Sequence, residues 1–290
     1  MKNPIIALSL IASLTACIGG EDGLPDYYTE ATTDATVTSD NAEKVVDEVV
    51  GSLKTTSSFG DDSNDINVSF KALHSGIRAS RATTADDALG DLGSLLSGDP
   101  IEGDCGGTTA WDISETSVNI SYNDYCTSVG ELQWVMDGYI NTSGSGTDTS
   151  GNSTTKMNLT TTFGTDVSKA AGTLKTTWDG STTTYVMDFT ASESKSGDSV
   201  KLSGFTIEED ADEEVVAISG DVCSNKIEGC VTVSTPTKFE KTADGDYSAG
   251  SLEIKSGTSV VKIDVTDTGT CDLILDDETL DTQDCTDYLP

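Results

Sequence analysis

The chain has 290 residues, of which 35% are hydrophobic and 23% are charged, enough to form one large domain or two small ones. Its 50 acidic and 16 basic residues give a formal net charge of −34 at pH 7. A surface this anionic repels polyanions, so we exclude nucleic acid and anionic lipid headgroups as partners.

The N-terminus has the features of a secretory signal. Lys2 precedes an apolar run over residues 5–14, which is too short for a membrane-spanning helix. The run ends in LTAC, residues 14–17, rather than in a small-x-small cleavage site. These four residues resemble the lipobox of bacterial lipoproteins, in which a signal peptidase cuts before a diacylglycerol-modified cysteine whose freed amine is then acylated. The alternative is an ordinary signal peptide and a cysteine that forms a disulfide later.

The lipobox implies a covalent lipid on Cys17, and we expect no other cofactor. Several acyl chains form a stable anchor because each buried CH₂ contributes roughly 0.8 kcal/mol. Ile18, rather than an aspartate, follows the cysteine. By the sorting rule of these lipoproteins, this residue implies the outer membrane of a Gram-negative cell. We therefore expect a signal peptide over residues 1–16 and a protein of the cell envelope that contacts the membrane through its lipid anchor and faces the periplasm or the outside.

The chain that follows begins with a linker and a helical section. Residues 17–38 are rich in Gly, Thr and acidic side chains without periodicity, and we expect an acidic, flexible tether. Residues 39–100 are the helical section. Apolar residues at helical spacing predict a helix over 39–53, and weaker patterns predict helices over 69–80 and 85–97.

Beyond this section the hydrophobic period changes to two, which predicts strands with one buried face. The clearest alternation is in Val118–Tyr122, Leu132–Met136, Met157–Phe163, Tyr185–Phe189 and Val216–Val222. We expect residues 101–290 to form a mainly β domain, an antiparallel meander of about ten to twelve strands. It should make a sandwich or a curved, partly closed barrel, with two or three short N-terminal helices packed on it.

Turn signals predict the register of several hairpins. Treating residues 179–180, Asp-Gly, as a two-residue turn places Leu174 opposite Tyr185, and a similar turn within 255–258 places Leu252 opposite Val261. A three-residue loop over 267–269 pairs the strands on either side of it. All these pairings place apolar side chains on one face, which supports a single register.

Six cysteines remain when Cys17 is set aside, and an even set in an exported protein predicts disulfides. Several connectivities are open, but the pairing that sets Val222 opposite Val231 favours local bridges. We expect the pairs Cys105–Cys126, Cys223–Cys230 and Cys271–Cys285. A metal site would need C-x₂-C spacing or histidine partners, and the sequence has neither.

No catalytic motif is found. His74 is the only histidine, and the chain lacks G-x-S-x-G, H-E-x-x-H and Walker sequences. Paired carboxylates, as in a glycosidase, give no signal among 50 acidic residues. We expect a non-enzymatic protein, with a hydrolase as a less favoured alternative.

Two groups of residues are candidate contacts. The first is a basic island that either pairs with acidic neighbours or contacts an anion or a protein partner: Lys71, Arg78 and Arg81. The second group consists of aromatic residues that either belong to the core or line a cavity for an apolar ligand: Trp134, Trp178, Tyr185 and Phe189.

The layout resembles a group of uncharacterised lipoproteins of Gram-negative bacteria. In these chains a lipobox precedes an acidic tether, a helix start like TSDNAEKV at 38–45, cysteine-bounded strands and a terminal hairpin like that at 245–265. The resemblance implies an envelope lipoprotein and brings no assigned activity. We therefore expect a structural or macromolecule-binding role. The alternative is a carrier of lipid or another apolar ligand, similar in architecture to the open barrels with helical lids that shuttle lipoproteins and lipids across the periplasm.

Overall fold

The computed structural model of the chain describes residues 24–30, 32–57, 100–114, 116–129, 132–147, 149–210, 215–242, 247–266 and 269–285. The expected signal peptide, Cys17 and the helices expected over 69–80 and 85–97 lie outside the described residues.

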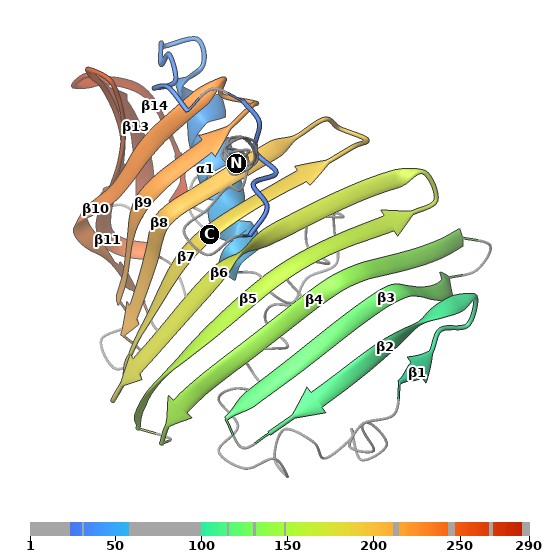
Figure 1. Ribbon diagram of the computed structural model, residues 1–290. Helices are drawn as coiled ribbons and strands as arrows, with labels where there is room; N and C mark the ends of the chain where they lie inside the picture. The colour runs from blue at the N-terminus through green and yellow to red at the C-terminus, as the bar shows by residue number, and fades with distance from the viewer. Residues whose placement is uncertain are drawn as a thin grey trace, which may run out of the picture.

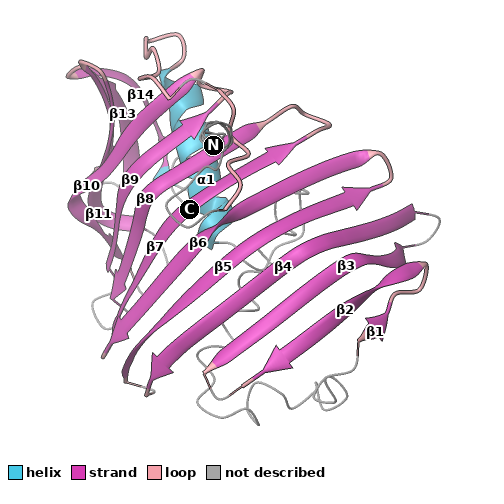
Figure 2. Ribbon diagram, in the orientation of Figure 1, coloured by secondary structure: helices cyan, strands magenta, loops and turns pink. Residues whose placement is uncertain are grey.

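The described residues form one antiparallel sheet of fourteen strands, in which each strand pairs with its neighbours in sequence. The sheet is the expected meander (Figure 1; Figure 2). Its strands are β1 (Ile101–Glu102), β2 (Gly106–Ile113), β3 (Ser117–Val129), β4 (Leu132–Gly146), β5 (Ser150–Phe163), β6 (Asp166–Asp179), β7 (Thr182–Glu193), β8 (Ser199–Asp210), β9 (Val215–Ser224), β10 (Gly229–Lys241), β11 (Tyr247–Ser256), β12 (Ser259–Val265), β13 (Thr270–Leu275) and β14 (Glu278–Asp284). All five alternating segments predicted from the sequence fall within strands.

The sheet is neither a sandwich nor a barrel. A sandwich would divide the strands between two sheets, and a barrel would pair β1 with β14. In the described part of the chain, β1 and β14 are instead the two edges of a single open sheet. Figure 1 shows that this sheet is curved and that its part from β8 to β14 curls around helix α1 (Ala42–Ser57). The expected sandwich or partly closed barrel is therefore corrected to one open, curved sheet, because alternation shows that a strand has a buried face but not what covers that face.

Glycine in the first position of a two-residue turn sets the register of three hairpins. The three turns begin at Gly164, Gly180 and Gly257, whose φ angles are 63°, 60° and 58°. The residue after each glycine does not have a positive φ, which is the pattern of a type II′ turn. The sequence interpretation, which places the glycine second, is wrong by two residues: Leu174 lies opposite Met187, not Tyr185. The buried face is unchanged, because side chains alternate with a period of two.

The turn at Gly257 has the same two-residue error: Leu252 lies opposite Ile263, not Val261. The other two predicted pairings are confirmed. Val265 lies opposite Cys271, as expected from a three-residue connection between the two strands. Val222 lies opposite Val231 in the hairpin of β9 and β10.

The sheet has an apolar inner face, which faces α1, and a polar outer face. One inner row crosses β5 to β8 through Met157, Gly172, Phe189 and Leu202. A Cβ on Gly172 would lie 2.7 Å from the Phe189 ring, so the glycine makes room for that ring. The neighbouring outer row consists of Asn158, Ala171, Thr190 and Lys201.

Helix α1 supplies an apolar stripe to the inner face. Ala42, Val45, Val46, Val49 and Val50 are at most 3% exposed and belong to the same core cluster as the sheet. Their spacing of three and four residues places them on one side of the helix. Each buried valine contributes roughly 1.5–3 kcal/mol.

The helix expected over 39–53 is confirmed and runs as far as Ser57. The expectation of two or three N-terminal helices is not supported. Among the described residues that precede the sheet, α1 is the one helix. No helix among the described residues combines the length and the apolarity needed to cross a bilayer.

The N-terminal segment, residues 24–38 without residue 31, packs on the sheet. The backbone N–H of Ala35 donates to the carbonyl of Cys230 at 2.9 Å, and the N–H of Cys230 donates to the carbonyl of Thr33 at 2.8 Å. Tyr28 and Ala35 are each 5% exposed. The expectation of a flexible tether does not hold for this segment, because its few apolar residues are anchored on the sheet.

We expect Gly180→Ala to lower the free energy of unfolding by about 1–2 kcal/mol, because a Cβ disfavours its positive φ. The new methyl group would meet no atom within 4 Å, so the backbone angle alone is tested. Ser181→Ala, in the same turn, is the matched control and should change stability by less than about 0.5 kcal/mol. Urea unfolding followed by circular dichroism measures both, and equal losses would contradict the type II′ turn.

Candidate functional site

All six cysteines of the β domain are paired in the three expected local bridges. Cys105–Cys126, Cys223–Cys230 and Cys271–Cys285 have Cα separations of 5.2, 3.9 and 4.8 Å. They fasten the start of the sheet, the β9–β10 hairpin and the chain that follows β14. A disulfide of this kind typically stabilises by about 2–4 kcal/mol. The set leaves no partner for Cys17.

The four aromatic residues expected to line an apolar cavity are spread over the inner face. Phe189 on β7 is buried in the core. Tyr185 on the same strand is partly buried and packs against the core cluster. Trp178 lies at the end of β6, where its indole N–H donates to the carbonyl of Thr147 at 2.9 Å. Trp134 lies on β4, three strands from Phe189. Core packing and the anchoring of a turn account for their positions.

The basic island of Lys71, Arg78 and Arg81 lies outside the described residues. Its expected role as an anion or partner contact stays a prediction.

The outer face has a cleft of about 280 Å³ between the N-terminal segment and strands β6 to β8. Leu24, Pro25 and Asp26 form one wall, and the charged residues on the sheet side are Lys175, Asp188 and Lys201. This volume is below the range of about 300–1,000 Å³ typical of drug-sized ligands, so the cleft suits a small polar group.

The charged groups of the cleft differ in their partners. The Nζ of Lys201 lies 2.7 Å from the Oδ2 of Asp26, and the two form an ion pair. The Oδ1 of Asp188 accepts a hydrogen bond from the N–H of Gly204 at 2.8 Å. Lys175 is exposed and forms no ion pair with any residue that the structure describes. Lys175 is therefore the cation of the cleft that is available to a ligand.

Tyr27 holds the N-terminal segment on the outer face. Its hydroxyl donates to the Oδ1 of Asn158 at 2.8 Å, and its backbone N–H donates to the Oγ1 of Thr190 at 3.1 Å. The Nζ of Lys169 lies 5.6 Å from the centre of the Tyr27 ring, a cation–π contact. Burial raises the pKa of Tyr27, so its hydroxyl stays protonated and able to donate at neutral pH.

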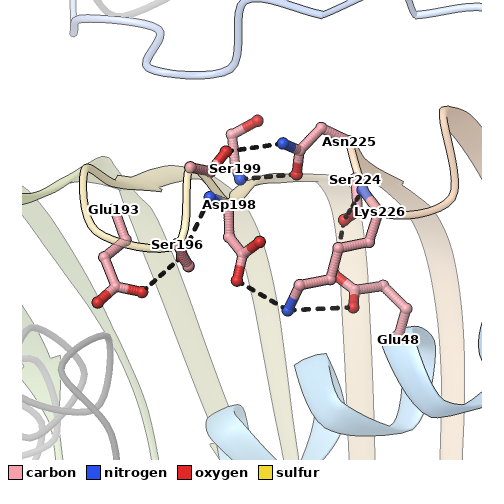
Figure 3. Close-up of polar contacts among 9 residues, drawn as sticks. Glu48, Glu193, Ser196, Asp198, Ser199, Ser224, Asn225 and Lys226 are labelled. Carbon is pink, nitrogen blue, oxygen red and sulfur yellow. Dashed lines mark hydrogen bonds and ion pairs between the residues drawn. The ribbon is translucent and has the colours of Figure 1, made fainter.

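A polar network at the ends of β7 to β10 fastens α1 to the sheet (Figure 3). The Nζ of Lys226 lies 2.9 Å from Asp198 and 3.7 Å from Glu48 of α1. The hydroxyl of Ser224 donates to Glu48 at 2.6 Å, and Asn225 accepts a hydrogen bond from the N–H of Ser199. Two turns and the helix therefore meet at one lysine.

The chemistry of this strand-end network is structural. Burial alone would lower the pKa of Lys226, but the hydrogen bond to Asp198 and the charges of Glu48 and Asp198 outweigh it and raise the pKa. The amine stays protonated at neutral pH, so it serves as an ion-pair partner rather than as a nucleophile or base.

The described residues contain no group of three or more His, Cys, Asp or Glu side chains that could hold a metal ion. The acidic side chains of this part of the chain are dispersed over strands and turns.

The comparisons with known proteins found no counterpart. No protein-family model matches the chain, and neither a characterised protein nor a solved structure is significantly similar to it.

The disulfides predict the number of reactive thiols. In unlipidated full-length chain unfolded without reductant, a maleimide should label one cysteine, and in Cys17→Ala it should label none. After reduction, the same two proteins should show seven and six labels, as their cysteine contents require. Mass spectrometry counts the labels, and any label on unreduced Cys17→Ala would contradict the three pairings.

We expect Lys226→Met to lower the free energy of unfolding by about 1 kcal/mol at neutral pH, because Glu48 and Asp198 lose their shared cation. Lys195→Met is the control, since Lys195 forms one exposed pair with Asp166 and its side chain is 65% exposed. The difference between the variants should shrink in high salt.

The pH dependence of this contribution has a definite sign. The folded pKa of Lys226 is raised, so the stabilisation is complete below its ordinary value of 10.5 and is lost as the pH rises through the folded value. Urea unfolding at neutral and alkaline pH measures it. A loss for Lys226→Met no larger than that for Lys195→Met would show that the network does not fasten the helix.

Proposed function

We propose that this chain is an exported lipoprotein, anchored to the outer membrane by lipid on Cys17, with a non-enzymatic structural or macromolecule-binding role. The observation that carries the proposal is the division of its seven cysteines. Six are paired within the sheet, and the seventh follows the apolar N-terminal run in the sequence LTAC.

Export is supported by the disulfides themselves. Disulfides persist in oxidising compartments such as the bacterial periplasm and are rare in the cytosol of mesophiles. A signal ending in a lipobox would deliver the chain to that compartment. Ile18 after the cysteine supports the outer membrane as the destination.

A binding role is supported by the outer-face cleft, where Lys175 has no ion-pair partner among the described residues. The carriage of a lipid or other apolar ligand has less support. The four aromatic residues proposed to line its cavity are dispersed, and inner-face positions of β4 and β5 carry the hydroxyls of Thr142, Ser153 and Thr155.

The anchor predicts the incorporation of fatty acid at one residue. Gram-negative cells that express the chain and are fed radioactive palmitate should label the wild-type protein but not Cys17→Ala. Cys285→Ala is the matched control, because it removes another cysteine and should keep the label. Immunoprecipitation and autoradiography measure the result, and equal labelling of wild type and Cys17→Ala would overturn the proposal.

A further inference from the structure

A basic surface interrupts the acidic character of the protein on the outer face of β5 to β7. The outward positions of these strands carry three lysines and two aspartates: Lys156, Lys169, Lys175, Asp179 and Asp188. We call the three lysines the lysine patch. Basic residues therefore outnumber acidic ones at these outward positions. In the whole chain the ratio is the reverse, with 50 acidic residues and 16 basic ones.

Two acidic side chains, Asp26 and Asp188, line the cleft beside Lys175, and Asp26 is paired with Lys201. Asp179 is the last residue of β6, beside the turn. Asp188 accepts a hydrogen bond from the backbone N–H of Gly204. The remaining outward positions of the three strands are Ser, Thr, Asn, Val and Ala, which are uncharged.

The first described residues of the N-terminal segment lie in the middle of the lysine patch. Lys169 lies over the ring of Tyr27, and Lys175 borders the same cleft as Leu24. The two contacts place residues 24–27 over β6 between Lys169 and Lys175, which are six residues apart on that strand.

The distance along the chain from the lipidation site to this point is short. Leu24 is the seventh residue after Cys17. Seven residues span at most about 25 Å, whatever their conformation. Strand β5, with 14 residues, is about 46 Å long. The lipidation site is therefore tied to Leu24 by a span of at most about half the length of β5.

We infer that the outer face of β5 to β7 lies against the membrane and that its lysine patch contacts anionic lipid headgroups. This inference rests on the proposed lipid anchor. An anchor attached at the centre of the patch holds that surface nearest to the bilayer. The cleft of about 280 Å³ beside Lys175 is of a size to admit a headgroup phosphate.

The net charge of −34 does not oppose this contact. The Debye length at physiological ionic strength is about 8 Å, so charges on distant strands are screened from the headgroups. Each lysine near an anionic surface strengthens the contact roughly fivefold. The exclusion of anionic headgroups, drawn from net charge alone, is therefore revised for this one surface.

The test is a footprint of lysine amines on the lipidated, full-length protein. The protein is placed in vesicles of phosphatidylcholine, in vesicles of phosphatidylcholine and phosphatidylglycerol, or in detergent, and acetylated briefly. Mass spectrometry then gives the rate at each lysine. Lys169 and Lys175 should react several-fold more slowly on the anionic vesicles than in detergent. Lys255 and Lys262, outward on β11 and β12, should react at unchanged rates.

Matched variants test the role of charge. In Lys169→Gln/Lys175→Gln, the remaining patch amine, Lys156, should lose its protection on anionic vesicles. In Lys255→Gln/Lys262→Gln, which removes the same charge elsewhere, Lys156 should keep it.

The inference is overturned if Lys169 and Lys175 are unprotected, if Lys255 and Lys262 are protected equally, or if neutral vesicles protect as well as anionic ones. Palmitate labelling of the same preparation separates the two proposals. Labelled protein without a footprint rejects the membrane-facing surface and keeps the anchor, whereas unlabelled protein rejects the anchor itself.

Discussion

The packing of α1 against the inner face of the sheet is the interaction on which the rest of the structure depends. An open sheet with one apolar face is stable in water only when another layer covers that face. The valine stripe of α1 contributes to this cover where the sheet curls, and Leu252, Ile254 and Ile263 in the curled part are fully buried. The strand-end network around Lys226 fastens the same helix from its polar side. The curl of the sheet and the position of the helix therefore stabilise each other.

The N-terminal segment extends this dependence to the outer face. Residues 24–27 lie on the outer face at Asn158 and Thr190, whereas Ala35 is buried in the same core cluster as α1. The segment therefore passes from one face of the sheet to the other beside β10, where it pairs with Cys230. The N-terminal segment is held on the outer face by Tyr27 and on the inner face by α1. Residues 24–26 are therefore fixed in place and form one wall of the outer-face cleft.

Local patterns predict the local part of this structure. The period of two identifies the strands, the valine spacing identifies α1, and the even set of cysteines identifies bridges between residues close in sequence. The position of Gly180 within its turn could not be read from the letters WDGS, because a glycine fits either central position of a two-residue turn. The cleft could not be predicted at all, because Asp26 and Lys201 are 175 residues apart. The lysine patch was within reach of the sequence, since Lys156, Lys169 and Lys175 alternate with inward residues, but only the strand pairing shows that they share one surface.

The strand pairs of the meander can form earlier than the contacts of the N-terminal segment. Neighbouring strands in a meander are close in sequence, and such contacts form early because little chain must be closed into a loop. The hydrogen bond from Ser256 to the carbonyl of Ala35 joins residues 221 positions apart. The segment around Ala35 is synthesised long before β11. It can therefore dock on the sheet only after β11 has been made. On the proposed route of export, the acyl chains would be attached while the segment beside them is still undocked, and membrane attachment would precede the last step of folding.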